Sequence, residues 1–196
     1  MSQQLQQQVI GRFEQTGAYL KGHFRLTSGL HSPEYLQCAK VLQYPAIAAE
    51  FGTAMAEWFK GQGRIDVVVS PAMGGLIIGH EVARALGVRF IFTERDSDSK
   101  MVLRRGFAIE PGERAVLVED VITTGGSSIE VIELLKAAGA EVLAAGSIID
   151  RSGGTADLGV ARVALATLMV TTYKPESCPL CEQGLPVQKP GSRPGK

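Results

Sequence analysis

Hydrophobic residues near the start of the chain recur roughly at the spacing of one helix face. Leu5, Val9, Ile10, Phe13 and Leu20 are separated mainly by glutamine and other polar residues. This pattern is typical of an amphipathic helix, whose polar side faces water or a partner. We therefore predict an N-terminal helix that acts as a lid or an interface element.

The next segment, residues 22–45, keeps neither the helical nor the strand period for long. We predict an extended stretch with turns at Ser28-Gly29 and Ser32-Pro33. Pro45 suits the first position of a helix, and the apolar residues after it lie on one face. That face predicts a helix ending near Gly61, and it consists of Ile47, Phe51, Met55, Trp58 and Phe59.

Beyond residue 64, short apolar runs alternate with segments of helical period. Helices are predicted over 74–87, where Gly87 closes the helix, and over 127–140. Strands are predicted over 65–70, 88–93, 114–120, 141–150 and 162–173, the last of them near a sheet edge. Such alternation favours an α/β fold with a mostly parallel central sheet and helices on both faces.

Composition and charge narrow the possible functions. The 196 residues are 45% hydrophobic, which suits one globular domain. Twenty basic and twenty acidic residues give zero net charge, so we expect no nucleic-acid or membrane partner and only local anion binding. The N-terminal residues lack the pattern of a signal peptide, and three cysteines are too few for a disulfide framework, so a cytoplasmic location is expected.

The segment "AVLVEDVITTGGSS", Ala115–Ser128, carries the clearest chemistry. Its apolar part predicts a buried strand, with Glu119 and Asp120 at the strand exit and residues 123–128 in the turn that opens the next helix. Gly125 and Gly126 permit close backbone approach, and hydroxyls and free helix N–H groups can bind an anion. The turn lacks the lysine of a GxxxxGK[ST] loop and the spacing of GxGxxG.

We interpret this turn as a cup for the phosphate of a sugar phosphate. Glu119 and Asp120 can then accept hydrogen bonds from two neighbouring sugar hydroxyls, favour positive charge at the anomeric carbon and help to place Mg²⁺. The structural alternative is that the carboxylates accept backbone N–H bonds and that the Gly-Gly-Ser-Ser run only caps a helix.

The string "VLVEDVITTGGSS" resembles the phosphoribosyl-pyrophosphate (PRPP) motif of type I phosphoribosyltransferases. "FRLTSGLHSPEYLQ" resembles the N-terminal hood of orotate phosphoribosyltransferases, while "SPAMGGLIIG" and "IIDRSGG" are similar to their pyrophosphate-side loop and orotate-contacting segment. The resemblance covers about Phe13–Tyr173. It implies transfer of phosphoribose from PRPP to orotate, giving orotidine 5′-monophosphate and pyrophosphate in pyrimidine nucleotide biosynthesis, with Mg²⁺ as cofactor.

The resemblance also implies roles for individual residues. Orotate would be contacted by Thr123, Arg151 and Tyr35, and Leu36 would also flank the base. The catalytic residues would be Lys100 and Asp120. Arg95, Lys100, Arg104 and Arg105 are the candidate cations for the leaving pyrophosphate. The implied PRPP contacts are Arg95, Lys100, Glu119, Asp120, Val121, Ile122, Thr123, Thr124, Gly125, Gly126 and Ser127.

The implied organisation is a single domain. Residues 1–44 form an N-terminal helix and hood, 45–173 the α/β core with a mobile loop at about 94–106, and 174–196 an irregular tail. In the family, that loop reaches a neighbouring subunit, which implies a homodimer with shared active sites. Without the family, the loop reads as a solvated charge run.

The chain departs from the family pattern at Thr27, at Met73-Gly74 and in lacking a loop histidine. These departures leave two alternatives open, a transferase for a purine or other base and a non-catalytic PRPP-sensing regulator that binds nucleic acid. "CPLC", Cys178–Cys181, has the spacing of half a zinc site, but no second CxxC or nearby histidine completes it, so no metal ligands are expected within one chain. Pairing of two CPLC segments across a dimer, reduced thiols and a disulfide are the open alternatives there, and Cys38 is expected to pack in the core.

Overall fold

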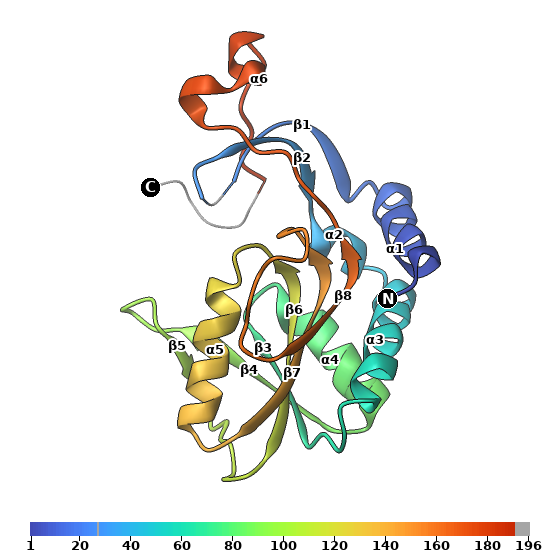
Figure 1. Cartoon of the computed structure of the whole chain (residues 1–196), viewed down its shortest axis with the longest axis vertical. Helices are drawn as coiled ribbons and strands as arrows, with labels where there is room; N and C mark the ends of the chain where they lie inside the picture. Colours follow the sequence, from blue (N-terminus) through green and yellow to red (C-terminus); the bar gives the residue numbers. More distant parts are fainter. Residues whose placement is uncertain (27, 191–196) are drawn as a thin grey trace.

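The computed structural model describes residues 1–26 and 28–190. Its centre is a sheet of six strands in the order β5-β4-β3-β6-β7-β8, with helices on both faces (Figure 1). The strands are β3 (Val67–Pro71), β4 (Arg89–Arg95), β5 (Met101–Leu103), β6 (Arg114–Ile122), β7 (Glu141–Asp150) and β8 (Ala161–Thr167). The predicted α/β class is confirmed, as is the position of the last strand at a sheet edge.

Strand pairing is parallel from β4 through β3, β6 and β7 to β8, and β5 pairs antiparallel with β4. The chain runs from β3 to its neighbour β4 on one side and later returns to place β6 on the other side of β3. A ligand crevice forms in such sheets where the winding reverses, outside the carboxyl ends of the strands. In this protein that point lies between β3 and β6.

The two faces of the sheet pack against different helices. Val68, Val116 and Val118 belong to the core shared with the helix group on one face, whereas Val67 and Leu117 belong to the core under α5 on the other. This alternation follows from the two-residue period of a strand. The helices of the first group are α1 (Gln3–Gln15), α2 (Cys38–Leu42), α3 (Pro45–Lys60) and α4 (Gly75–Leu86), and α5 spans Gly126–Ala137.

Helix boundaries agree well with the sequence signals at α3 and α4. Pro45 occupies the first turn of α3, which is followed by Gly61 as predicted. Gly87 closes α4 with a φ of 72°, a left-handed conformation that glycine adopts at little cost. The N-terminal helix was predicted too long, because it ends at Gln15 and Leu20 lies in the following strand.

The hood is an antiparallel pair of strands, β1 (Tyr19–Arg25) and β2 (His31–Leu36). Ser28-Gly29 lies between them, as predicted, whereas Ser32-Pro33 lies inside β2 and the predicted turn there is wrong. Proline is tolerated at this point because the pairing register shifts between Lys21 and Phe24, so an irregularity in the opposite strand removes the need for a donor.

The C-terminal segment folds back over the hood. It contains a 3₁₀ turn, η1 (Pro175–Ser177), and a short helix, α6 (Pro179–Glu182), which lies beyond β1 and β2 in Figure 1. Tyr173 exchanges two backbone hydrogen bonds of 2.8 Å with His31 on one side of the hairpin. Gln188 accepts from Arg25 and donates to His23 on the other side, both at 2.8 Å.

The long polar segment after β4 is partly a β-hairpin. Thr93 pairs with Leu103 and Arg95 with Met101, so β5 forms the outer edge of the sheet next to β4. Among the described residues, no helix combines the length and the apolar character needed to span a bilayer.

Candidate active site

The turn between β6 and α5 has the backbone geometry of an anion cup. Gly125 adopts a φ of 83°, and a Cβ built there would lie 2.6 Å from Leu158 Cδ2, so a larger residue would be both strained and crowded. Helix α5 begins at Gly126 with no side chain capping it. The first N–H groups of a helix have no intrahelical partner, and here they are directed at the end of the sheet together with exposed Thr123 and Thr124.

Glu119, which is buried, and Asp120, which is half-buried, bring two carboxylates to the same end of the sheet. Both lie within β6 near its carboxyl end, as predicted, and the strand continues two residues further, to Ile122. Burial, reinforced by the neighbouring charge of Asp120, raises the pKa of Glu119 well above its usual value. Burial also raises the pKa of Asp120, although the Val121 N–H donates to its Oδ1 at 2.8 Å. The site is therefore short of positive charge.

The loop after β3 lies against these carboxylates. A Cβ on Gly74 would come within 2.5 Å of both Asp120 carboxylate oxygens, so only glycine allows this approach. Met73 beside it is 78% exposed. The stretch from Met73 to Gly75 thus faces the crevice between β3 and β6 across from the phosphate cup.

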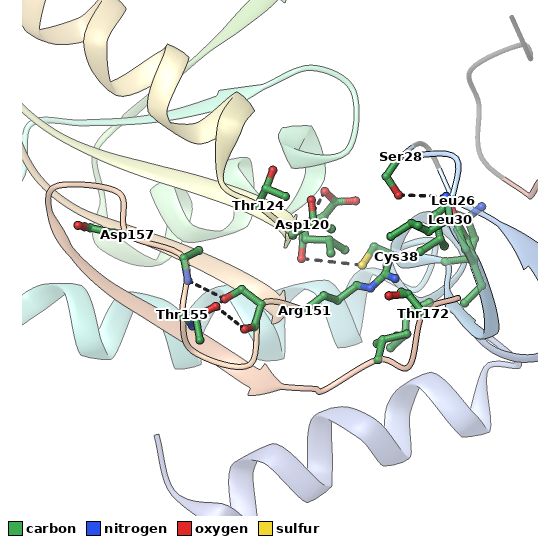
Figure 2. A pocket seen from close by; sticks show the side chains of 18 residues that line it. Leu26, Ser28, Leu30, Cys38, Asp120, Thr124, Arg151, Thr155, Asp157 and Thr172 are labelled. Carbon is green, nitrogen blue, oxygen red and sulfur yellow. Dashed lines mark hydrogen bonds between the residues drawn. The ribbon is translucent and has the colours of Figure 1, made fainter. Parts of the chain in front are cut away.

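A pocket of about 700 Å³ opens beside Asp120 (Figure 2). Its walls come from the hood, from the ends of β6 and β7 and from the segment after β8. The hood and the residues next to it supply Leu26, Ser28, Leu30, Tyr35, Leu36, Gln37 and Cys38. The sheet and its loops supply Asp120, Val121, Thr123, Thr124, Arg151, Ser152, Thr155, Ala156, Asp157, Val170 and Thr172.

Arg151 carries an unneutralised charge into this pocket. Its side chain extends towards Cys38 and Thr172 in Figure 2. Its Nε is buried and has no hydrogen-bond partner in the described part of the chain. Burial lowers the pKa of the guanidinium, while Tyr35 and Cys38 work in the opposite direction. A guanidinium remains protonated in proteins, so Arg151 presents a planar cation to a ligand.

The neighbouring Asp150 is fully committed to protein contacts. It is 1% exposed, accepts hydrogen bonds from Ser152 N at 2.7 Å and Ser152 Oγ at 2.6 Å, and pairs with Arg162 at 2.6 Å. Burial raises its pKa, but these hydrogen bonds outweigh the burial and hold the pKa below its usual value. Asp150 therefore shapes the loop that carries Arg151 without neutralising Arg151. This role of Asp150 could not be predicted from the sequence, because its partner Arg162 lies in another strand, β8.

Arg95 lies beside the phosphate cup. It pairs with Glu130 of α5 at 3.1 Å, and its guanidinium is 3.4 Å from Ser127 Oγ. Glu130 also accepts a hydrogen bond of 2.8 Å from Met101 N, so it ties the β4-β5 hairpin to the start of α5. Sequence reasoning missed Glu130, since a glutamate on an amphipathic helix is usually a solvated residue.

The other loop cations differ in how they are held. Arg105 is paired with Glu94 at 2.7 Å and lies over the Phe92 ring at 5.7 Å. Lys100 is exposed, and its side chain forms no ion pair within residues 1–26 and 28–190. Arg104 is likewise exposed and forms no ion pair within these residues, so Lys100 and Arg104 are the two loop cations whose side chains are not held by the protein.

Comparison with known proteins identifies the family. A family model described as the phosphoribosyl transferase domain matches residues 37–163. The chain is 54% identical over 187 residues to the orotate phosphoribosyltransferase of Desulforamulus reducens, covering 95% of this chain and 97% of the relative. The chain belongs to the orotate phosphoribosyltransferase family. A second member, from Pelotomaculum thermopropionicum, is 55% identical over 186 residues, with the same shares of both chains covered.

The fold is that of solved orotate phosphoribosyltransferases. The crystal structure of the enzyme from Aeropyrum pernix superposes with a TM-score of 0.70 at 27% identity, covering 82% of this chain and 93% of that one. The resemblance stated from the sequence motifs is therefore confirmed.

Structure and sequence differ in which predicted residues surround the pocket. Tyr35, Asp120, Thr123 and Arg151 line it together. Other predicted site residues do not line this pocket, namely Glu119, Arg95, Lys100 and the residues from Gly125 to Ser127. Ile122 is buried in the core under α5. Thr27, a departure from the orotate phosphoribosyltransferase pattern, lies outside the described residues. Cys38, the first residue of α2, is buried in the core, as predicted.

The prediction that no histidine lies near Cys178 and Cys181 is wrong. His23 and His31, from the two strands of the hood, lie against both cysteines. The reason is topological, because the tail returns to the hood and so joins residues more than 140 positions apart.

Proposed function

We propose that this protein transfers the 5-phosphoribosyl group of PRPP to orotate, producing orotidine 5′-monophosphate and pyrophosphate in pyrimidine nucleotide biosynthesis. The observation that carries this proposal is Arg151, a half-buried cation in the pocket next to the proposed ribose-phosphate cup, whose buried Nε has no acceptor among the described residues. Orotate differs from the other common bases in carrying a carboxylate, which a guanidinium binds in a bidentate manner. The names and high identity of the relatives support the same substrate.

The 5′-phosphate of PRPP binds to the turn that opens α5. It is held there by hydroxyl groups and by the free N–H groups of the helix, from Thr123, Thr124 and the residues from Gly125 to Ser127. The ribose then lies over the end of β6, where Glu119 and Asp120 accept hydrogen bonds from its two hydroxyls. Their negative charge also favours the positive charge that develops at the anomeric carbon as its bond to pyrophosphate breaks. Asp120 is therefore assigned a catalytic role.

Orotate occupies the pocket between the hood and the end of β7. Arg151 binds its carboxylate, Thr123 contacts the ring, and Tyr35 and Leu36 flank it. Tyr35 packs on Phe24 of the neighbouring strand, with ring centroids 5.8 Å apart, which supports a fixed position for the aromatic wall. The ring nitrogen of orotate forms the new bond to the anomeric carbon while pyrophosphate leaves on the opposite side.

The leaving pyrophosphate is met by two groups of donors. Lys100 and Arg95 supply positive charge from the β4-β5 hairpin, and backbone N–H groups near Gly74 and Gly75 supply hydrogen bonds from the loop after β3. Because Lys100 is held by no ion pair in the described structure, it is able to move to the leaving group.

The donor set fits Mg²⁺ as a cofactor. Glu119 and Asp120 are adjacent carboxylates whose pKa values are raised, and hard oxygen donors are the ligands that Mg²⁺ accepts. When bound, Mg²⁺ would neutralise charge on the pyrophosphate, and Glu119 and Asp120 would hold it through ribose hydroxyls or water.

We also propose a homodimer in which the β4-β5 hairpin of one subunit completes the site of the other. Exposed Met73 and Ile77 at the start of α4 support an apolar interface next to the site. A cytoplasmic location is proposed as well, and the free thiols of Cys38, Cys178 and Cys181 are consistent with a reducing compartment.

The direct test is a turnover assay. Purified protein mixed with Mg²⁺, PRPP and orotate should consume the orotate absorbance and release pyrophosphate, whereas parallel reactions with adenine, hypoxanthine or uracil should release none. Pyrophosphate release with a purine but not with orotate would reject the substrate. PRPP binding without turnover of any base, together with salt-dependent binding of DNA or RNA, would reject the enzyme in favour of a regulator.

A further inference from the structure

Four metal-ligating side chains meet at one point in the hood, away from the proposed active site. His23 comes from β1, His31 from β2, and Cys178 and Cys181 from the tail around α6. One ligand atom of each residue lies within 4.8 Å of the ligand atoms of the other three. We propose that these residues form a structural zinc site, which does not depend on the proposed enzymatic function.

The distances between the ligand atoms are close to those of a tetrahedral zinc site. Sulfur and nitrogen ligands bound at about 2.3 Å and 2.0–2.1 Å from zinc stand roughly 3.5 Å apart. Here Cys178 Sγ and Cys181 Sγ lie 3.6 and 3.8 Å from His23 Nε2, and Cys181 Sγ lies 3.4 Å from His31 Nδ1. The two imidazole nitrogens are 2.8 Å apart, so an ion between them requires a separation of only about half an ångström more.

The surroundings of His23 suit a metal ligand. Its other ring nitrogen, Nδ1, lies 2.8 Å from the carbonyl oxygen of Leu185 and donates to it. This hydrogen bond places the proton on Nδ1 and leaves the lone pair of Nε2 facing the cysteines. Metal-binding histidines are commonly oriented by such a bond to a backbone carbonyl, which fixes the tautomer and the ring plane.

The sequence spacing and the local backbone also fit. Cys178 and Cys181 are separated by two residues, and Cys181 N donates to Cys178 O at 3.0 Å, so a tight turn presents both sulfurs to one side. Two cysteines and two histidines form one of the common structural zinc donor sets. The cluster contains no carboxylate, which favours zinc over Mg²⁺ or Ca²⁺.

Burial explains why an ion is needed here. His23, His31 and Cys178 are 2%, 6% and 1% exposed, and Cys178 belongs to neither of the two hydrophobic cores that cover the sheet. No residue of α6 is buried, and Leu185 and Val187 are 43% and 46% exposed. Hydrophobic packing therefore does little to hold the tail, whereas four bonds to one ion would fix it to both strands of the hood.

The zinc site would act on the pocket through the hood. A two-stranded hairpin is marginally stable by itself, and this one supplies Leu26, Leu30 and Tyr35 to the pocket wall. The bridges from Tyr173 and Gln188 already place the tail on both edges of the hairpin. Zinc would hold these contacts together and so keep the orotate-side wall in place.

The first experiment measures metal content. Protein purified without chelators or metal-affinity resin, under reducing conditions, should contain one zinc ion per chain by mass spectrometry of the metals. The zinc content should fall below one tenth of an equivalent in each of three variants, Cys181→Ser, Cys178→Ser and His31→Asn. The control variant His80→Asn, which changes the exposed histidine of α4, should retain a full equivalent. Cys181 is the exposed member of the cluster, so its serine variant is the one expected to stay folded.

The second experiment uses a spectroscopic probe and thiol state. Metal-free protein titrated with Co²⁺ should develop the visible bands of tetrahedral cobalt with thiolate ligands at one equivalent, and these bands should be absent in Cys181→Ser. Chelation of zinc should raise the KM for orotate several-fold and speed proteolysis after residue 173, and added zinc should reverse both changes. Folded wild-type protein that binds no zinc or cobalt, or that contains a Cys178–Cys181 disulfide instead, would overturn the proposal.

Discussion

Arg151 illustrates how one side chain is prepared for a single class of ligand. The carboxylate next to it in the chain, Asp150, is occupied by Ser152 and Arg162 and leaves the charge of Arg151 unneutralised. An unpaired buried polar group costs about 1–3 kcal/mol, more when charged, and a ligand carboxylate recovers that cost. The folded protein is thus less stable than it could be at the position where we propose that orotate binds.

Replacement of Arg151 is expected to weaken orotate binding selectively. Arg151→Ala should raise the KM for orotate by roughly 10- to 100-fold, the value of a charge-assisted hydrogen-bonded pair, and leave the KM for PRPP within about twofold. Arg151→Lys should recover only part of the loss, since an ammonium lacks the planar fork. Steady-state kinetics with each substrate varied provide the measurement.

Arg64 offers a matched control for this change. It is an exposed arginine paired with Asp66 before β3, at the opposite end of the sheet from the pocket. Arg64→Ala should leave both KM values unchanged. Equal losses for orotate and PRPP in Arg151→Ala would contradict the assignment of Arg151 to the base.

Glu119 connects function to pH-dependent stability. Its pKa in the folded state lies above the unfolded value of about 4.3, so between these two values the folded state binds more protons than the unfolded chain. Stability is therefore lost as the pH rises through this window and is unaffected by Glu119 below it. Glu119→Gln removes this loss while also removing a ligand for the ribose.

We expect Glu119→Gln to be more stable and less active than the native protein. At pH 8 its Tm should be about 2–4 °C higher, the shift that roughly 1 kcal/mol causes in a chain of this size, and the difference should shrink towards pH 4. The KM for PRPP should rise. The measurement is thermal unfolding across this pH range. Glu133→Gln, which changes an exposed residue of α5, is the control. A gain in Tm that is equal at all pH values would exclude the Glu119 carboxylate as its source.

Features of the site that are formed by one short segment of the chain could be predicted from the sequence. The turn that opens α5 and the glycine at position 125 are properties of one short segment, and the structure has both, whereas phosphate binding by Thr123–Ser127 stays a prediction. Glu130 could not be found in this way, because its role depends on Arg95 and Met101 from a neighbouring hairpin.

At the level of elements, the β4-β5 hairpin carries the loop cations in unequal environments. Arg105 is held by Glu94 and Phe92, and Arg95 by Glu130, whereas Lys100 lies at the end of the hairpin with a backbone hydrogen bond from its N–H to Asp96 Oδ1 at 2.9 Å. A charge that must approach the leaving group is better placed at the hairpin end than in an existing ion pair.

Substitution of Lys100 and of Arg105 should distinguish a loop cation that takes part in catalysis from one that does not. Lys100→Ala should lower kcat about 100-fold, the effect of removing one preorganised donor to developing charge. Arg105→Ala should change kcat less than threefold, since its charge is already neutralised by Glu94. The measurement is kcat at saturating PRPP and orotate, and a near-normal rate in Lys100→Ala would remove this residue from the mechanism.

The errors in predicted elements have identifiable causes. Leu20 continued the apolar spacing of the first helix, but the helix had already stopped before Gly17, whose φ is 61°. Ser32-Pro33 resembled a turn because proline usually interrupts a strand, and the bulge in β1 that accommodates it depends on pairing. Strand β5 has three residues, too few for any period to reveal.

On the scale of the whole molecule, the proposed sharing of the active site between two subunits makes a quantitative prediction. Co-expression of Lys100→Ala with Arg151→Ala should give mixed dimers in which one site has both defects and the other has neither. At orotate concentrations well below the KM of Arg151→Ala, each variant alone is nearly inactive, whereas random pairing restores about a quarter of native activity. Activity per subunit in the purified mixture is the measurement.

A second pair of variants provides the control. Arg151 and Tyr35 lie in the pocket of the same chain, so mixing Arg151→Ala with Tyr35→Ala should leave one defect in every site and restore nothing. Absence of recovery in the first mixture, with dimers present by light scattering, would show that the hairpin serves its own subunit.

Contacts between segments far apart in the chain could not be predicted from the sequence. The α/β core followed from periodicity because each strand and helix is a local pattern, and the family motif placed the site at the strand ends. His23 and Cys178 are separated by more than 150 positions and by the whole core, so their contact with each other depends on the return path of the tail. Neither spacing nor composition contains that path.

The return of residues 173–188 to the hood also orders events during synthesis. The hairpin is among the first segments to leave the ribosome, yet the strand neighbours that flank it on both edges, Tyr173 and Gln188, are translated after the entire sheet. The nascent chain must therefore carry an incomplete roof over its orotate pocket until these late residues emerge. Base binding is expected to be the last property that the newly made protein acquires.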